Sequence, residues 1–281
     1  MASNLIETDG PILCNPLTDP EWVIEKNPTS PTAQLHPFSS GATRAIDSVS
    51  VIKGSALFAE SGAGAHYYAF SSQSTTYTEA FVNVKLPTRL KTDTGNGLRR
   101  AFISLGIHGN LRGVDLGLKN DGDGWMPWYY DPTGNAGGGF VPSYVAPSTA
   151  TNAVMTVKPV NTTTVEFYVR YTDANGNTVG DPFWRQITVG SGNFTAVNGK
   201  INCKFYRFAS LVPNGFADNQ MDSTYMLGGQ FTNCQLYNGT SYVAWGIGNT
   251  TITNAWKVSP ERMTLTYSGT TDSFGIDHWS T

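Results

Sequence analysis

The near absence of helical periodicity is the feature that most restricts how this chain can fold. No stretch of roughly twelve or more residues keeps apolar side chains at positions i, i+3 and i+4 without a Pro or Gly break. Short runs that alternate apolar and polar residues fill the chain instead, and clusters of Gly, Asn, Asp and Pro bound them. This pattern is typical of antiparallel strands joined by turns and predicts an all-β protein.

Several neighbouring runs indicate how the strands follow one another. AFVNVKLP, AFISLGIHG, VDLGLKN and GWMPWYYD occur in this order between residues 80 and 131, as expected of successive antiparallel strands. Residues 165–189 form the clearest hairpin, because Asn175-Gly176 suits the positive φ pair of a tight turn. About a dozen such runs without helical crossovers predict a two-sheet antiparallel β-sandwich of jelly-roll type with little helix, since parallel sheets need long connections.

The length of 281 residues is compatible with one large sandwich, so we expect a single domain over 1–281. Charged residues make up 14% of the chain, against about 25% in an ordinary soluble domain, and the net charge is −3. This composition argues against nucleic acid as a partner and suits neutral polar ligands. No run of about eighteen apolar residues predicts membrane insertion, and the oligomeric state stays open.

The N-terminus, MASNLIETDGPIL, lacks the basic start and apolar core of a secretory signal. Residues 1–3 could be a cloning remnant that hides a removed signal, and in that case an extracellular location is favoured. The three cysteines allow at most one disulfide, for which Cys203 and Cys234 are the candidate pair. Buried free thiols are the alternative.

Alternation also divides three strands into an aliphatic face and a face that mixes aromatic and polar groups. The mixed faces carry Phe102, Ser104 and His108; then Glu166, Tyr168 and Arg170; and then Asn202, Lys204, Tyr206 and Phe208. A sheet whose second face presents such groups is a candidate binding groove, since an ordinary solvated face would carry mainly Lys and Glu.

The chain resembles the concanavalin A-like lectin and glucanase superfamily. The resemblance rests on PLTDPEWVIE, the series from Ala80 to Asp131, the hairpin VEFYVRYTDANGNTVGD and the closing run SFGIDHW. It implies a jelly roll of two sheets with a concave sheet facing the ligand. The E-x-D-x-x-E strand of glucanases is absent. Alginate-type polysaccharide lyases carry a Q-I-H strand and a strand rich in Tyr and Lys. GIH and CKFYRF resemble these strands only in part, because the Gln of Q-I-H has no counterpart here.

Calcium is the one cofactor that the sequence suggests, and no organic cofactor is expected. The runs NLIETDG and FGIDHW resemble the strand pair that often holds a structural calcium in carbohydrate-binding jelly rolls, which makes Asp277 a candidate ligand. In NDGDGW, Asp121 and Asp123 could supply further oxygens to this hard ion. A plain turn built from Asn, Asp and Gly is the alternative.

A catalytic set can be assembled from the mixed faces as His108, Tyr168, Arg170, Lys204 and Tyr206. In β-elimination on a uronic acid, Arg or Lys neutralises the carboxylate so that the C5 proton becomes acidic, and His or Tyr removes it. Hydrolysis would instead need two carboxyl groups, for which Glu166 with Asp115 is the available pair.

The candidate ligand-binding residues are Trp125, Trp128, Tyr129, Trp184 and Glu166. Aromatic rings stack on sugars while the Trp NH and Tyr OH donate hydrogen bonds, although any single ring could pack in the core. The sequence therefore predicts binding of a glycan or polysaccharide on a concave aromatic-lined sheet. A polysaccharide lyase is one alternative, and a viral or phage structural or receptor-binding protein, suggested by the Gly, Ser, Thr and Asn content, is the other.

Overall fold

The computed structural model describes most of the chain from residue 65 onwards. The described residues are 65–92, 99–110, 113–120, 122–130, 139–213, 224–257, 261–267 and 270–278, with four short strands at 6–7, 22–25, 34–37 and 50–53. Among them are many strands and two short 3-10 helices, η1 (Pro142–Tyr144) and η2 (Ile247–Asn249). Within these residues, no helix is long and apolar enough to cross a membrane.

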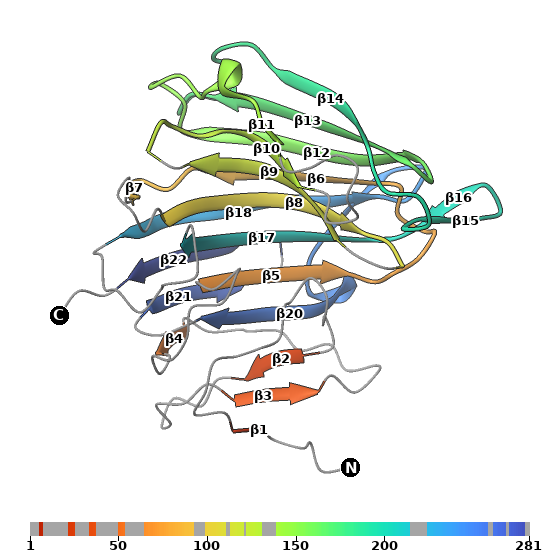
Figure 1. The fold of residues 1–281 in the computed structure, drawn as a ribbon, viewed down its shortest axis with the longest axis horizontal. Coiled ribbons are helices and arrows are strands. Elements are labelled where there is room, and N and C mark those ends of the chain that lie inside the picture. The colour runs from red at the N-terminus through yellow and green to blue at the C-terminus, as the bar shows by residue number, and fades with distance from the viewer. Residues whose placement is uncertain are drawn as a thin grey trace.

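Two large antiparallel sheets face each other and form a jelly-roll β-sandwich, as the sequence predicts (Figure 1). The seven-stranded sheet has the order β11 (Gly139–Phe140), β10 (Met126–Tyr130), β9 (Gly113–Asn120), β8 (Arg99–His108), β17 (Lys204–Pro213), β5 (Ala65–Ser71) and β20 (Thr250–Lys257). The ten-stranded sheet runs β14 (Phe183–Thr188), β13 (Thr164–Thr172), β12 (Asn152–Asn161), β6 (Glu79–Lys85), β18 (Tyr225–Tyr237), β22 (Asp272–His278), β21 (Glu261–Tyr267) and β4 (Ser50–Lys53). Strands β7 (Arg89–Lys91) and β19 (Tyr242–Ala244) pair with β18 beside this path.

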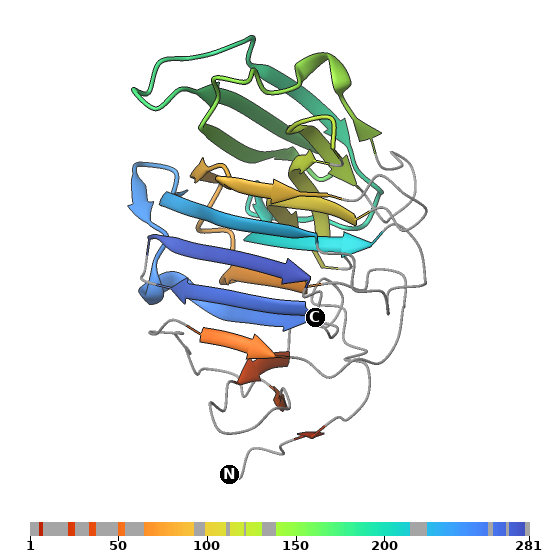
Figure 2. The ribbon, with the colours of Figure 1, turned by 90° about the vertical axis from the view of Figure 1, so that its left-hand side faces the viewer.

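Two small sheets complete the described structure. One consists of β1 (Ile6–Glu7), β3 (Gln34–Pro37) and β2 (Trp22–Glu25), and the other is the hairpin β15 (Thr195–Val197) with β16 (Lys200–Asn202). The views in Figures 1 and 2 place the three-stranded sheet at one end of the molecule and β13 with β14 at the other end. The sandwich between them therefore carries the large accessible faces.

The core lies between the two sheets and follows the predicted alternation. Ile103, Leu105 and Ile107 of β8 point into it, as do Val165 and Phe167 of β13, and all five are fully buried. The intervening residues of each strand therefore point to the outer face of their sheet, because successive side chains alternate.

Two local predictions are corrected by the structure. The run AFVNVKLP belongs to β6 of the ten-stranded sheet, where it pairs with β12 and β18, so only β8, β9 and β10 form the predicted meander. The hairpin of β13 and β14 is present, but positive φ occurs at Gly176 (86°) and Gly180 (69°) and not at Asn175. Asp173 widens this turn, because its Oδ1 accepts hydrogen bonds from the backbone NH groups of Asn175 and Asn177.

The cysteine prediction also resolves in favour of its alternative. Cys203 and Cys234 are both buried free thiols, as the alternative expects, and the candidate disulfide between them is not formed. Cys203 leads into the seven-stranded sheet, whereas Cys234 lies on β18 of the ten-stranded sheet. Burial raises the pKa of each thiol to about 12, which keeps both protonated.

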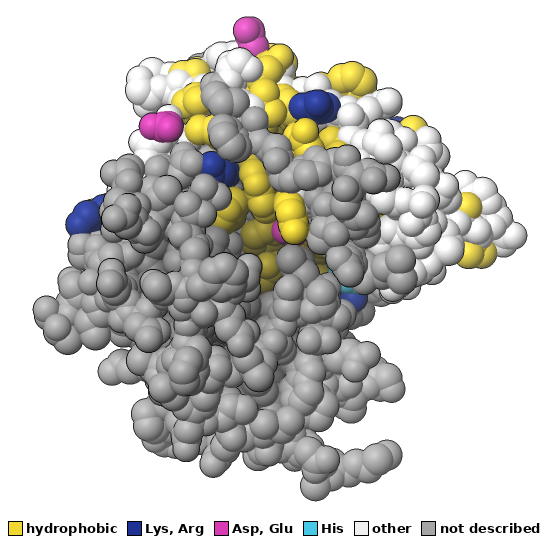
Figure 3. Space-filling view, in the orientation of Figure 1, with side chains coloured by type: hydrophobic (Ala, Val, Ile, Leu, Met, Phe, Trp, Pro, Cys, Tyr) yellow, Lys and Arg dark blue, Asp and Glu magenta, His cyan; other side chains and the backbone are white. Residues whose placement is uncertain are grey.

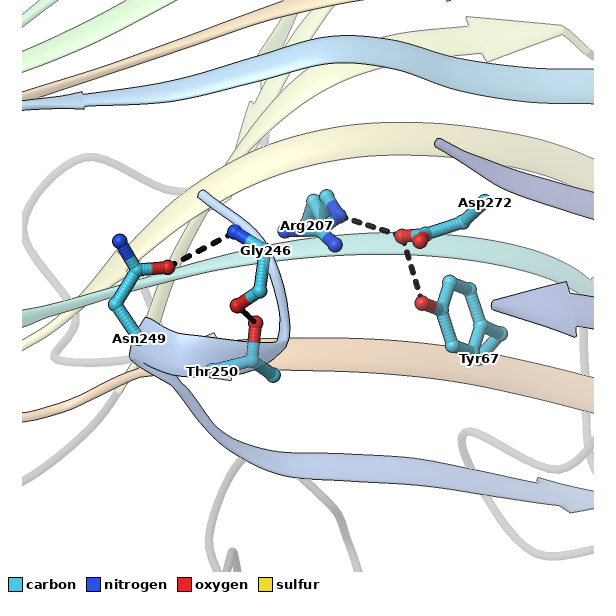
Figure 4. A network of polar contacts seen from close by, with 6 residues as sticks. All are labelled: Tyr67, Arg207, Gly246, Asn249, Thr250 and Asp272. Atoms are coloured by element: carbon cyan, nitrogen blue, oxygen red, sulfur yellow. Dashed lines mark hydrogen bonds and ion pairs between the residues drawn. The ribbon is translucent and has the colours of Figure 1, made fainter. Parts of the chain in front are cut away.

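A buried ion pair joins the two sheets across the core (Figure 4). Arg207 of β17 donates from Nε to Oδ2 of Asp272 on β22 over 2.6 Å, and the hydroxyl of Tyr67 on β5 donates to the same oxygen over 2.7 Å. Both charged side chains have no exposed surface. The ring of Trp245 lies 4.5 Å from the Arg207 guanidinium carbon and adds a cation–π contact. We call Tyr67, Arg207 and Asp272 the inter-sheet clamp.

Candidate functional site

The outer face of the seven-stranded sheet carries a cluster of aromatic rings that is separate from the core. Alternation on β5, β8 and β17 places these rings there, and Trp128 of β10 packs against them. Ring centroids lie 4.8 Å apart for Tyr68 and Phe208, and 4.6 Å apart for Phe102 and Trp128. We call this group the outer aromatic cluster; its members are Tyr68, Phe70, Phe102, Tyr206, Phe208 and Trp128.

This face is hollowed. Figure 3 shows hydrophobic side chains gathered in a depression on the side where β8, β9 and β10 face the viewer, with an acidic side chain at its floor. Trp128 is partly exposed, whereas the other rings of the outer aromatic cluster are buried. The depression therefore offers an indole at its accessible edge and packed rings below. We call it the hollow.

Asp115 is the acidic residue on this face. Asp115 on β9 lies opposite Tyr130 on β10. Its Oδ1 accepts a hydrogen bond of 2.6 Å from the hydroxyl of Tyr206. The side chain is only 5% exposed. Burial raises the pKa of Asp115 to about 7, although the hydrogen bond from Tyr206 acts in the opposite direction. A carboxyl group that titrates near neutral pH can both accept and donate a proton under physiological conditions.

The phenols around Asp115 stay protonated. Burial raises the pKa of Tyr206 well above its usual value, and the charge of Asp115 raises it further. Burial and the same charge also raise the pKa of Tyr68. Tyr206 is therefore a hydrogen-bond donor that orients the carboxylate, and its raised pKa does not suit the role of base predicted for it.

Two glycines make room for this arrangement. A Cβ atom at Gly106 of β8 would lie 2.2 Å from the ring of Tyr206, and one at Gly117 of β9 would lie 2.4 Å from the backbone of Ser104. Real Cβ contacts are never this short, so both positions need glycine. The missing side chain at Gly106 allows the Tyr206 ring to lie over β8 and reach Asp115 on β9, and the one at Gly117 allows β9 to lie close to β8.

His108 and Lys204 lie at the same end of this face. They are direct Cα partners across β8 and β17, two residues along from the Gly106–Tyr206 pair. The Nδ1 atom of His108 donates to the carbonyl of Gly109 over 2.7 Å, which fixes the orientation of the imidazole ring. The ammonium of Lys204 lies 5.2 Å from the centroid of the Phe70 ring and is partly exposed.

The predicted catalytic set is divided between the two sheets. His108, Lys204 and Tyr206 share the outer face of the seven-stranded sheet. Tyr168 and Arg170 lie on β13 of the ten-stranded sheet and alternate with Val165, Phe167 and Val169, which are buried in the core. They therefore point away from the hollow, with the whole sandwich between the two groups.

The predicted ligand-binding residues are also distributed over different faces. Trp125 is buried in the core, where its carbonyl accepts a hydrogen bond of 3.1 Å from the hydroxyl of Tyr171. Tyr129 packs against the core, and the guanidinium of Arg185 lies 5.3 Å from its ring centroid. Only Trp128 of this segment joins the hollow.

Glu166 and Trp184 lie together on the outer face of the ten-stranded sheet. Trp184 is opposite Tyr168, and Glu166 is opposite Gln186, whose amide donates to it over 3.4 Å. The hydrolytic pair of Glu166 with Asp115 is therefore not assembled, because the two carboxyl groups lie on opposite sides of the sandwich.

The predicted calcium ligands are only partly described. Asp121 lies outside the described residues, as does the side chain of Asp277, while Asp123 is exposed in a turn. In this turn Asn120 Oδ1 accepts a hydrogen bond from the backbone NH of Gly122 over 2.9 Å, as the turn alternative expects. Among the described residues no three His, Cys, Asp or Glu side chains gather as a metal site.

Asp115 had a role that the pattern alone did not assign. Its signal was present, because a carboxylate stands within the otherwise apolar run Val114–Leu118 with glycine two positions later. A central strand rarely carries an acid unless that acid has a partner. The partner, Tyr206, is 91 residues away along the chain.

Comparisons with known proteins give fold-level likenesses. No family matches the sequence, and no curated protein matches it either. Among solved structures, Scytalido-glutamic peptidase with a peptide-based transition state analog is 12% identical with a TM-score of 0.49, and the match covers 75% of this chain and 97% of that one. SCP-B, a member of the eqolisin family of peptidases in complex with a tripeptide, is 12% identical with a TM-score of 0.47. This match also covers 75% of this chain and 97% of that one.

The marine PL-14 alginate lyase from Aplysia kurodai is also similar, at 12% identity and a TM-score of 0.33 over 56% of this chain and 81% of that one. With TM-scores below 0.5, these matches assign no function to this chain.

Proposed function

We propose that the protein is an acid–base enzyme that binds a glycan in the hollow of the seven-stranded sheet, with Asp115 as the group that transfers the proton. The observation that carries this proposal is the buried Asp115 carboxyl, held by Tyr206 at 2.6 Å and titrating near pH 7. Perturbed carboxyl groups in an aromatic pocket cluster at functional sites. A sandwich with its ligand on one sheet also fits the proposed concanavalin A-like relationship.

The charged groups favour β-elimination over hydrolysis. Glycoside hydrolysis uses two carboxyl groups that flank the scissile bond. In the described part of the outer face, Asp115 is the single carboxyl group, and its companions are His108 and Lys204. One acid–base carboxyl with the Lys204 ammonium on the same face suits a substrate that brings its own carboxylate, as a uronic acid does.

The proposed reaction uses Asp115 twice. Its carboxylate accepts the C5 proton of a uronate, and the electron pair of the C–H bond becomes a double bond between C4 and C5. The C4–O bond breaks, and the departing oxygen takes the proton from Asp115, which ends the cycle as a carboxylate. The Lys204 ammonium would stabilise the negative charge on the uronate during this step. Tyr206, which has no exposed surface, acts as a positioning residue.

Ultraviolet absorbance tests this reaction, because each turnover creates an unsaturated uronate. We expect the wild-type protein to raise the absorbance of alginate, polygalacturonate or hyaluronan, with kcat/KM rising through about pH 7 as Asp115 loses its proton. Asp115→Asn should lower the rate by about 100-fold or more, whereas Asp123→Asn, at an exposed turn, should not change it. No absorbance change across the uronate panel would overturn the lyase assignment.

Binding without catalysis is the second candidate, and the partly exposed Trp128 favours it. An indole at the edge of the hollow can stack on a sugar whether or not Asp115 reacts. In this case glycan arrays would detect a ligand that Trp128→Ala loses and Asp115→Asn keeps. If both Trp128→Ala and Asp115→Asn kept binding the ligand, the hollow would be excluded as the binding site.

A further inference from the structure

A second row of aromatic side chains crosses the opposite face of the sandwich. Trp184 of β14 is the Cα partner of Tyr168 on β13, Tyr168 of Thr156 on β12, and Thr156 of Phe81 on β6. These four residues therefore share one line across four neighbouring strands. They point outward, because the residues on either side of Tyr168 are buried in the core.

The row continues onto β18 and β19. The ring of Tyr242 lies 6.2 Å from that of Phe81 and 5.0 Å from that of Tyr237. The hydroxyl of Tyr242 donates a hydrogen bond to the carboxylate of Glu79, which fixes the phenol on this face. We call the whole row the outer band; its members are Trp184, Tyr168, Thr156, Phe81, Tyr237 and Tyr242.

The exposure of these rings is the unusual feature. Trp184 is 57% exposed and Tyr242 is 46% exposed, and the rings between them are partly exposed. On the other outer face, the accessible rings are Trp128 and Tyr130 of β10, whereas the remaining rings of the outer aromatic cluster are buried. A row of accessible aromatic rings with two exposed ends, rimmed by polar groups, is typical of an interaction surface.

The groups beside the outer band identify the chemistry of its ligand. One row away, Lys158 lies opposite Glu166, and Glu166 lies opposite Gln186. On the other side of the outer band, Arg170 lies opposite Val154 of β12, and Val154 lies opposite Asn83 of β6. Acids and bases alternate, so this surface attracts neither a polyanion nor a polycation, and its amides and hydroxyls offer neutral hydrogen bonds.

We propose that the outer band is a binding site for a neutral glycan chain that lies across the strands. Neighbouring strands are about 4.8 Å apart, so Trp184 and Phe81 are separated by three such steps, or about 14 Å, with Tyr168 between them. Rings at this spacing can stack on successive sugars of one chain. This proposal is independent of the reaction proposed for the hollow, because it uses the other sheet and a ligand without charge.

Affinity electrophoresis in gels that contain soluble β-glucan, xylan or galactomannan tests the proposal. We expect retardation of the wild-type protein by at least one of these polymers. Trp184→Ala should weaken the interaction about tenfold, as loss of a stacking side chain does, and Trp184→Ala with Tyr168→Ala should abolish it. Both residues are outside the core, so circular dichroism should show folded variants.

Tyr130→Ala is the matched control, because Tyr130 is 42% exposed but belongs to the seven-stranded sheet. This variant should keep the wild-type affinity. Asp115→Asn should also bind neutral polymers normally, which separates a failure of this proposal from a failure of the lyase. Retardation by none of the polymers would overturn the proposal. Equal retardation of Trp184→Ala and the wild-type protein would also overturn it. So would dimers in light scattering that depend on Trp184, if no glycan were bound.

Discussion

At the scale of single residues, Asp115 makes stability depend on pH in a direction opposite to that of most carboxyl groups. Its pKa is about 7 in the folded protein, against 3.8 for the ordinary group. The folded state therefore binds more protons than the unfolded state between these values, and the free energy of unfolding falls as pH rises from about 4 to 7. At 1.36 kcal/mol per pKa unit, the full difference is about 4 kcal/mol.

Replacing this carboxyl with a neutral amide should remove that dependence. Asp115→Asn keeps an oxygen that accepts the Tyr206 hydrogen bond but cannot become charged. We expect the variant to match wild type at pH 4 and to exceed it by up to about 4 kcal/mol at pH 8 in urea unfolding. Asp123→Asn, in an exposed turn, should follow the wild-type curve. Parallel curves for Asp115→Asn and wild type would show that the carboxyl is not buried as described.

Gly106 provides a second test at the scale of one residue. A methyl group there would lie 2.2 Å from the Tyr206 ring, so the ring must move and its hydrogen bond to Asp115 must lengthen. We expect Gly106→Ala to cost about 1 to 3 kcal/mol, as overpacking does, and to shift the inflection of the pH profile. Gly248→Ala is the control, because nothing lies within 4 Å of its added Cβ. Equal stability of the two variants would contradict this account.

At the scale of strands, the inter-sheet clamp connects β5 and β17 to β22. Removing one charge of a buried pair leaves the other without compensation, which typically costs about 3 to 5 kcal/mol. We therefore expect Asp272→Asn to lose about this much in urea unfolding. Glu166→Gln, which removes a carboxylate from the outer face, should cost less than about 1 kcal/mol.

A double variant separates the charge effect from packing. Arg207→Met with Asp272→Leu removes both charges, so it should be more stable than Asp272→Asn alone, although Tyr67 loses its acceptor. The single variants Arg207→Met and Asp272→Leu complete the comparison. If their losses of unfolding free energy simply added up to the loss of the double variant, the ion pair would contribute no coupling energy.

The faces of individual strands could be predicted from the sequence, whereas the pairing of strands could not. Alternation gave the correct inward residues of β8 and β13 because its period of two is local. The same pattern reads identically in either sheet, which is why β6 was assigned to the wrong neighbours. For this reason Tyr168 and Arg170 were grouped with His108, although the core separates them.

At the scale of the whole molecule, the candidate site depends on contacts that no local pattern contains. The residue types of the hollow were recognisable, and His108, Lys204 and Tyr206 do share one face. The raised pKa of Asp115 could not be predicted, because it results from burial among rings that come from β5, β8 and β17. Burial is set by the assembled sandwich and by no single strand.

The same interleaving predicts that the sandwich unfolds as one unit, in line with the expected single domain. The chain passes repeatedly between the sheets, as β5 and β8 belong to one sheet while β6 belongs to the other. The clamp joins residues 205 positions apart, Tyr67 and Asp272. Neither sheet can therefore lose its strands while the other keeps its core.

The two buried thiols report on this cooperativity, because Cys203 adjoins β17 and Cys234 lies on β18. Pulsed alkylation at increasing urea, followed by peptide mapping, should give the same midpoint for both thiols and for far-ultraviolet circular dichroism. Burial and a pKa of about 12 protect each thiol until its sheet opens. If Cys234 reacted at a lower urea concentration than Cys203, the ten-stranded sheet would open by itself, and the two faces would belong to separately folding layers.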